Sequence, residues 1–142
     1  MYHGICADFS NEQHWKDATI AKADIYLSSA LISKSGLQQD FELLSERAKM
    51  NSLNVVLANS VGVTGGWNAA GGSGVWNSDG YHTLSASDNE CIVLCRISNS
   101  GVSGEVINIT KLSRDILKWA FAARILSHFK PLRMQACYAM PR

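Results

Sequence analysis

Residues 2–10 read Tyr2-His-Gly-Ile-Cys-Ala-Asp-Phe-Ser10. The short apolar run through Gly4-Ile5-Cys6 predicts a β-strand, and Ser10 followed by Gln13 has the spacing of a helix capping box. We therefore expect Cys6 at the end of a strand, on a turn toward a helix N-terminus, where the helix dipole favours a nucleophilic thiolate. Cysteine is also among the residues most often buried, so packing in the core is the alternative interpretation of Cys6.

The next fifty residues alternate between helix and strand patterns. Helices are predicted over residues 11–22 and from Leu37 to Asn51, because apolar side chains recur at three- and four-residue spacing. Continuous apolar strands are predicted over residues 24–28 and 54–58. The inward-facing side chains are expected to be Trp15, Ala18, Phe41, Leu44 and Ala48. Successive strand-helix-strand units build a parallel sheet covered by helices, so the fold class is α/β.

A glycine-rich segment follows. Six of the eleven glycines lie between Gly62 and Gly74, which predicts a mobile or tightly turned loop. This loop lacks the Gly-Lys-Ser/Thr ending of a phosphate-binding loop, and no helix follows it. We therefore expect it to line a pocket instead, with Trp67 as one wall.

The strands after the glycine-rich segment are predicted over residues 74–77, 81–86 and 91–97. They form an antiparallel meander, so the sheet as a whole is expected to be mixed. Cys91 and Cys95 fall four residues apart on one face of the last strand, a position that favours packing over chemistry.

Composition indicates one globular domain, with 46% apolar and 18% charged residues. The sequence shows neither a membrane-spanning run nor a signal-peptide pattern, so we expect no membrane association. The four cysteines form no C-x-x-C pair, which favours free thiols and a cytoplasmic location. The four histidines are scattered, so no metal and no cofactor are expected. A Cys–His pair of Cys6 with His3 or His14 stays open.

Charge divides the chain into two expected segments. Residues 1–107 carry six Lys/Arg and eleven Asp/Glu, whereas residues 108–142 carry seven Lys/Arg and only Asp115. An amphipathic helix is predicted from Ser113 to about Phe129, and the segment 132–142 is expected to be loose. The basic helix has no RNA-binding signature. We therefore favour a helix whose basic side faces solvent and whose apolar side packs on the rest of the chain, over a helix that binds nucleic acid.

Three ordered blocks resemble the nitrilase superfamily, the carbon–nitrogen hydrolases. The first is Gly4-Ile-Cys-Ala-Asp8 with Ala23-Asp-Ile-Tyr-Leu-Ser-Ser29, which is similar to the family's catalytic-cysteine segment. The second, Glu46 to Asn59, is similar to a helix–strand pair that ends in Ala-Asn. The third runs from Gly62-Val-Thr-Gly-Gly-Trp67 to Asp79-Gly80 and resembles the family's glycine-rich loop and following strands.

The resemblance implies an αββα sandwich and hydrolysis of a small amide or nitrile without a metal. Cys6 would be the nucleophile, the backbone N–H of Ala7 would stabilise the oxyanion, and Asn59 and Trp67 would contribute to the substrate pocket. The family's Glu and Lys precede its cysteine by many tens of residues, whereas five residues precede Cys6 here.

The chain is therefore expected to be the C-terminal half of such a domain. We expect half of the αββα sandwich, with a mixed β-sheet in residues 1–107, plus the C-terminal amphipathic helix. The hydrolase is expected to be weak or inactive alone. The alternative is a non-catalytic interaction module that self-associates as a homo-oligomer through its exposed sheet.

Overall fold

The computed structural model describes residues 1–109 and 134–138. The predicted helix from Ser113 to Phe129 lies outside these residues. In chain order the elements are β1 (Tyr2–Ile5), the 3₁₀ helix η1 (Cys6–Ser10), α1 (Glu12–Ile20), β2 (Ile25–Ala30), α2 (Leu37–Asn51), β3 (Asn54–Asn59), β4 (Val61–Thr64), β5 (Trp67–Ala70), β6 (Gly74–Trp76), β7 (His82–Ser85), β8 (Cys91–Ser98), β9 (Gly101–Asn108) and β10 (Met134–Tyr138).

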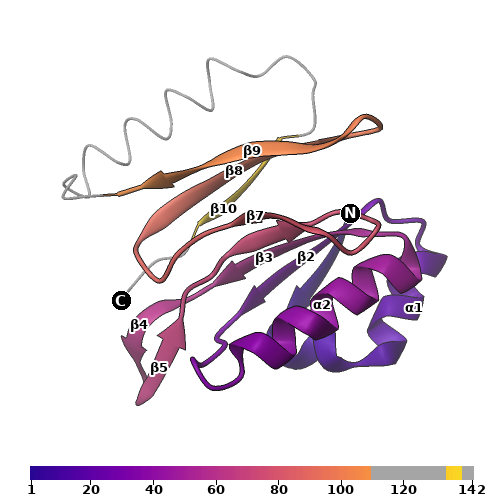
Figure 1. Cartoon of the computed structure of the whole chain (residues 1–142). Helices are drawn as coiled ribbons and strands as arrows, with labels where there is room; N and C mark the ends of the chain where they lie inside the picture. Colours follow the sequence, from indigo (N-terminus) through magenta and orange to yellow (C-terminus); the bar gives the residue numbers. More distant parts are fainter. Residues whose placement is uncertain (110–133, 139–142) are drawn as a thin grey trace.

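A five-stranded sheet in the order β1-β2-β3-β6-β7 forms the middle layer of the fold (Figure 1). β1, β2 and β3 are parallel because α1 and α2 connect them, whereas β6 and β7 are antiparallel additions. The predicted mixed sheet is thus confirmed. Ile5 is level with Ser29, and Ala30 is level with Asn59, so the three parallel strands end at one edge. We call this the carboxyl edge.

Helices α1 and α2 cover one face of the sheet (Figure 1). Trp15, Ala18, Leu44 and Ala48 are buried there as predicted, and Phe41 is partly buried. The Trp15 ring stacks on Tyr26 of β2 with centroids 3.8 Å apart. Burying a side chain as large as that of Leu44 contributes about 1.5–3 kcal/mol, which favours keeping the helices on this face.

Both predicted helices are present, and α2 has the predicted bounds. The predicted capping residue of α1 is wrong. Asn11, not Ser10, is the N-cap, and its side chain accepts a hydrogen bond from the backbone N–H of Gln13 at 3.0 Å. The N-cap of α1 lies one residue later than predicted because η1 includes every residue from Cys6 to Ser10.

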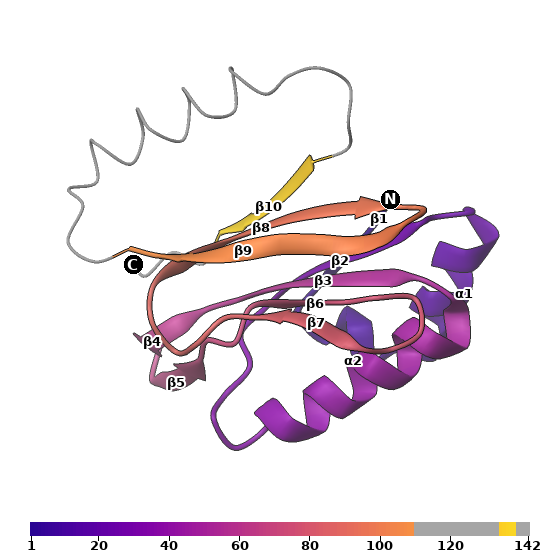
Figure 2. The same ribbon diagram turned by 45° about the horizontal axis from the view of Figure 1, so that its top comes forward.

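The other face of the five-stranded sheet is covered by a second sheet (Figure 2). Its strands have the antiparallel order β10-β8-β9. Ile25, Val56 and Val75 of the first sheet are buried in one cluster with Val93 and Cys95 of β8. The expectation of a single sheet with this apolar face exposed is wrong, because β8 packs on the face instead of joining the edge. The observed layers are helices, mixed sheet and small antiparallel sheet.

Two local predictions are also corrected. The segment from Gly62 to Gly74 contains a β-hairpin, since β4 and β5 are antiparallel around a turn at Gly65 and Gly66. Both turn glycines have positive φ, 55° and 82°, as a tight two-residue hairpin turn requires. In the segment 132–142, which was expected to be loose, residues Met134–Tyr138 form β10 and pair with β8.

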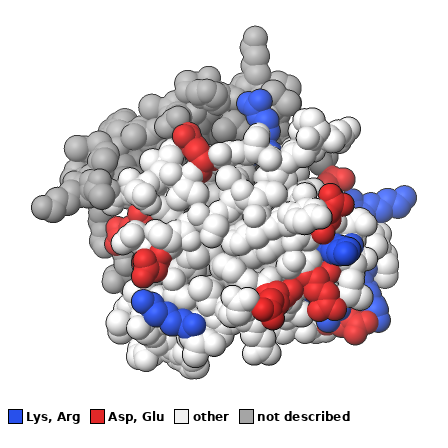
Figure 3. Space-filling view, in the orientation of Figure 1, with Lys and Arg blue, Asp and Glu red and all other residues white. Residues whose placement is uncertain are grey.

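Charged side chains of both signs lie mixed on the face shown in Figure 3, mainly over α1 and α2. In α1, Lys16 and Glu12 form an ion pair at 2.8 Å. No helix in the described part of the chain is both long and apolar enough to cross a membrane. The predicted boundary between residues 107 and 108 stays a prediction.

Candidate functional site at the carboxyl edge

Cys6 lies directly after β1, at the carboxyl edge. It is the first residue of η1, its side chain is exposed, and its φ is 51°. A left-handed backbone costs a non-glycine residue about 1–2 kcal/mol, so the surrounding structure has to hold it in place. The Asp8 carboxylate does this across the turn, because its Oδ2 accepts a hydrogen bond from the Ile5 N–H at 2.8 Å.

The position of Cys6 in the sheet suits a ligand site. In open α/β sheets, ligands bind beyond the carboxyl ends of the parallel strands. Because Ile5 is level with Ser29, Cys6 is level with the end of β2, one strand away from the end of β3. Ala7 follows Cys6 in η1 and is exposed.

Asn59 ends β3 at the same edge, but its side chain is buried and hydrogen-bonded to the backbone. Its Oδ1 accepts from the Ile32 N–H at 2.8 Å, and its Nδ2 donates to the Gly71 carbonyl at 2.6 Å. Its own N–H donates to Ser73 Oγ at 2.9 Å. The amide of Asn59 therefore fixes the segments after β2 and after β5 against each other, and any influence on a substrate acts through them.

Trp67 is 61% exposed and begins β5 on the hairpin (Figure 1). The hairpin projects beyond the end of the five-stranded sheet, near the start of α2. The Trp67 side chain and Cys6 thus both lie at exposed positions toward the carboxyl edge. A role for Trp67 as a pocket wall stays a prediction.

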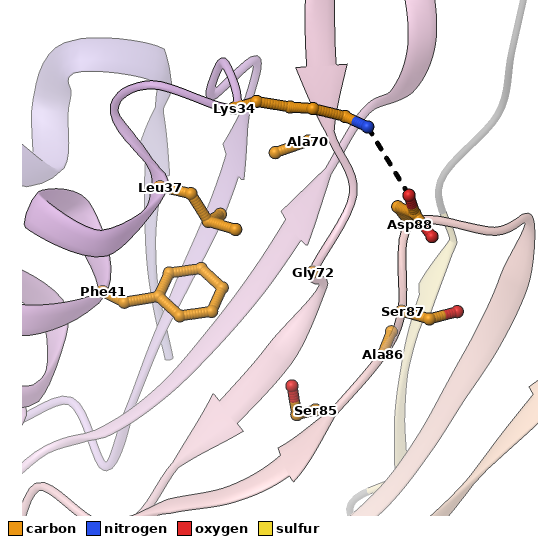
Figure 4. Close-up of a pocket in the computed structure, with 9 residues that line it drawn as sticks. All are labelled: Lys34, Leu37, Phe41, Ala70, Gly72, Ser85, Ala86, Ser87 and Asp88. Carbon is orange, nitrogen blue, oxygen red and sulfur yellow. Dashed lines mark ion pairs between the residues drawn. The ribbon is translucent and has the colours of Figure 1, made fainter.

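A pocket of about 430 Å³ lies at the other end of this edge (Figure 4). Leu37 and Phe41 project from α2 toward Gly72, and Lys34 Nζ spans to Asp88 Oδ2 at 3.6 Å. The remaining lining residues are Ala70, Ser85, Ala86 and Ser87. Cys6 is not among the residues that line this pocket. The glycine-rich pattern predicted a pocket with Trp67 as one wall; Ala70 and Gly72 of that segment do line this pocket, but Trp67 is not among its lining residues.

The two cysteines on β8 behave as core residues. Cys91 and Cys95 are buried, and burial raises the pKa of both thiols, so they stay protonated at neutral pH. This matches the packing role predicted from their spacing. Exposed Cys6 is the cysteine suited to nucleophilic chemistry among the residues with described side chains.

The histidines take no direct part at Cys6. Within residues 1–109 the structure has no hydrogen bond between Cys6 and either His3 or His14. His14 instead lies between Tyr26 and Asp8, with Nδ1 2.7 Å from the Tyr26 hydroxyl. No local sequence pattern predicts the contact between His14 and Tyr26, because the two residues are twelve positions apart. Among the described residues, no group of three His, Cys, Asp or Glu side chains has the arrangement of a metal site.

The chain matches no protein-family model and no curated protein. Solved structures do match. Nit3 of Saccharomyces cerevisiae, a nitrilase-superfamily member, aligns with a TM-score of 0.57 and 19% identity over 89% of this chain and 42% of its own. A mutant of the nitrilase-superfamily amidase of Nesterenkonia AN1 aligns with a TM-score of 0.56 and 19% identity over 84% and 43%. Another mutant of that amidase carries the acetamide moiety of fluoroacetamide on its active-site cysteine.

A third match is the glutamine-dependent NAD+ synthetase of Acinetobacter baumannii, with a TM-score of 0.57 and 24% identity over 80% of this chain and 19% of its own. This chain spans less than half the length of each of these proteins. The matches and the observed layers together show that the chain has a partial form of the nitrilase-superfamily fold.

Proposed function

We propose that this chain carries the nucleophilic cysteine of a carbon–nitrogen hydrolase that acts on a small amide or nitrile. The observation that carries the proposal is Cys6 itself, an exposed thiol on a left-handed turn at the carboxyl edge of the parallel strands. The fold it shares with amidases supports the same reaction class.

In the proposed reaction on an amide, the Cys6 thiolate attacks the carbonyl carbon and forms a carbon–sulfur bond. The negative charge moves to the carbonyl oxygen, where the Ala7 N–H stabilises it. The carbon–nitrogen bond then breaks, and the nitrogen leaves as ammonia or an amine after taking up a proton. Water hydrolyses the resulting thioester, which releases the acid and restores the thiol.

This reaction also needs a base for the thiol and a donor for the leaving nitrogen. The resemblance assigns these roles to a Glu and a Lys that match no position in this chain. We therefore expect weak or no turnover from the 142-residue chain alone, because a nucleophile without its base loses most of the rate. Trp67 serves as a pocket wall in this proposal, and Asn59 positions the segment that includes Gly71.

Fluoroacetamide tests the nucleophile without requiring turnover. The Cys6 thiolate displaces fluoride from its CH₂F carbon, so the acetamide group stays on sulfur, and peptide mass spectrometry locates it. We expect labelling of Cys6 at least about tenfold faster than labelling of N-acetylcysteine at the same pH, because a bound amide is held near the thiol. The variant Cys6→Ser should remain unlabelled at this position. Labelling no faster than that of the free thiol would contradict the proposal.

A second candidate function is self-association, favoured by the exposure of one sheet edge. β1 is the outer strand of the five-stranded sheet, and Ile5 on it is 72% exposed. An apolar edge strand offers unpaired backbone groups to a second copy of the chain. In this case the fold is kept as an interaction module, and the homo-oligomer forms along β1 rather than through the covered face.

A further inference from the structure

The Cys6 turn is connected to the core by a chain of polar contacts that runs through His14. Its inner end is Tyr26 of β2, which is fully buried and stacked on Trp15. The Tyr26 hydroxyl lies against Gly4 of β1, where a Cβ would come within 2.8 Å of the Tyr26 Cζ. Only glycine fits at position 4, so the residue just before the Cys6 turn leaves space for this hydroxyl.

His14 of α1 forms the middle of the chain of contacts. Its Nδ1 is 2.7 Å from the Tyr26 hydroxyl, and its ring meets the ring of Tyr2 edge-on at 4.9 Å. Its other nitrogen, Nε2, is 3.8 Å from Asp8 Oδ2. That distance is too long for a hydrogen bond, so the contact with Asp8 depends on whether the imidazole is charged.

Asp8 forms the outer end. The same Oδ2 that faces His14 accepts the hydrogen bond from the Ile5 N–H, and this bond closes the turn over Cys6 and Ala7. A positive charge on His14 therefore acts directly on the oxygen that holds the turn. It also offsets a negative charge that lies two residues from the thiol and opposes formation of its thiolate.

We propose that His14 is a positioning residue for Cys6, which in its protonated form pairs with Asp8, holds the thiol-bearing turn and favours the reactive thiolate. This rests on Cys6 being the nucleophile of the proposed function. The groups that face His14 are Asp8 from η1, Tyr2 from β1 and Tyr26 from β2. Arg47 on α2 is not one of these groups, and its charge contributes, after Lys16, to lowering the pKa of Glu12.

Tyr26 accommodates both states of the imidazole. Burial raises the pKa of Tyr26 far above its usual value, so the phenol stays neutral. Its hydroxyl can donate to a neutral Nδ1 or accept from a protonated one. Because the charge of the imidazole decides the contact with Asp8, the reactivity of Cys6 should depend on whether His14 is protonated as well as on the state of its own thiol.

The test is the rate of Cys6 alkylation by iodoacetamide in the full chain between pH 5 and 10, read on the Cys6 peptide by mass spectrometry. We expect two ionisation steps in the unmodified chain. In His14→Gln the lower step should disappear, and alkylation at the acid end of this range should slow by about threefold to tenfold, because the cation that offsets the charge of Asp8 is gone.

Asp8→Asn distinguishes an effect of the Asp8 charge on Cys6 from a general disruption of the turn. The amide oxygen can still accept from the Ile5 N–H, but the negative charge is gone. This variant should therefore lose the lower step and become faster, opposite in direction to His14→Gln. Glu12→Gln is the matched control, because it removes an equal charge from a residue paired with Lys16 and should keep both steps.

Equal slowing in His14→Gln and Asp8→Asn would overturn the proposal. A single ionisation step in the unmodified chain would also overturn it. This measurement tests the proposal even where a variant does not fold. Alkylation needs no hydrolysis, so two steps without accelerated fluoroacetamide labelling would support the role of His14 and contradict the proposed function.

Discussion

At the scale of single residues, the packing of His82 makes the stability of the fold depend on pH. Its ring stacks on Trp76 with centroids 4.1 Å apart and meets Phe41 edge-on at 5.2 Å. Desolvation lowers the pKa of His82, and a backbone hydrogen bond at Leu84 opposes this only in part. The folded chain therefore binds this proton less readily than the unfolded chain does.

The sign of the stability effect follows from that difference. The contribution of neutral His82 is complete above the unfolded value of about 6.5 and is lost as pH falls through the lower folded value. We expect His82→Phe, which keeps an aromatic ring, to lose less stability than the unmodified chain between pH 7.5 and 5. The difference should stay below about 1 kcal/mol because solvent screens the residue.

Urea unfolding at the two pH values measures this difference. His3→Gln is the control, since His3 is an exposed histidine on β1 and its replacement should leave the difference between the two pH values nearly unchanged. An identical loss of stability in His82→Phe and in the unmodified chain would show that His82 does not contribute.

At the scale of elements, the buried amide of Asn59 holds three segments together. Asn59→Ala would leave the Ile32 N–H and the Gly71 carbonyl without their partner in a site that is 1% exposed. Buried polar groups without partners are costly, so we expect a loss of about 2–4 kcal/mol in the free energy of unfolding. Hydrogen exchange at the Ile32 amide should accelerate by more than that of the strand amide of Val56.

Asn68→Ala is the matched control for this prediction. Asn68 is an exposed asparagine on β5, where it pairs with Val63 through the backbone, and no described hydrogen bond involves its side chain. Its replacement should cost less than about 0.5 kcal/mol, as is usual for surface positions. If the two variants were equally stable, the Asn59 amide would not hold the segments after β2 and after β5 against each other.

The elements that could be predicted from the sequence are those whose signal is local. The spacing of Leu44 and Ala48 identifies α2, and the apolar run of β3 identifies a buried strand. β9 and β10 were missed because their pairing with β8 is not encoded in any local pattern, and residues 101–108 mix glycine with polar side chains. The glycines between Gly62 and Gly74 predict a loop, whereas β4 and β5 form a hairpin there, because glycine is common in both loops and hairpin turns.

The candidate site divides in the same way. The family-like motif indicated Cys6 and Ala7, because a short segment contains both. The turn that carries Cys6 is closed by Asp8, whereas His14 and Tyr26 follow on different elements, and only folding brings His14 close to Asp8 and Tyr26. Asn59 was predicted as a substrate contact, and only the folded chain reveals that its amide faces the backbone of two other segments.

At the scale of the whole molecule, the second sheet determines which surface is open to a partner. It buries Val56 and Val75 on one face of the five-stranded sheet, and the helices bury the other face, so a partner can reach this sheet at its outer strands, and the outer strand β1 carries exposed Ile5. A four-residue edge strand with exposed Ile5 has room for antiparallel pairing with a second copy.

We therefore expect the chain to form a dimer whose fraction rises with concentration in size-exclusion chromatography with light scattering. Ile5→Lys should shift it toward monomer, because a charge on an edge strand opposes pairing. Val63→Lys is the control, since Val63 is 80% exposed on β4, outside the five-stranded sheet. A monomer at every concentration, or an equal shift in both variants, would show that β1 is not the interface. In that case self-association along this edge would no longer compete with catalysis as the function of the fold.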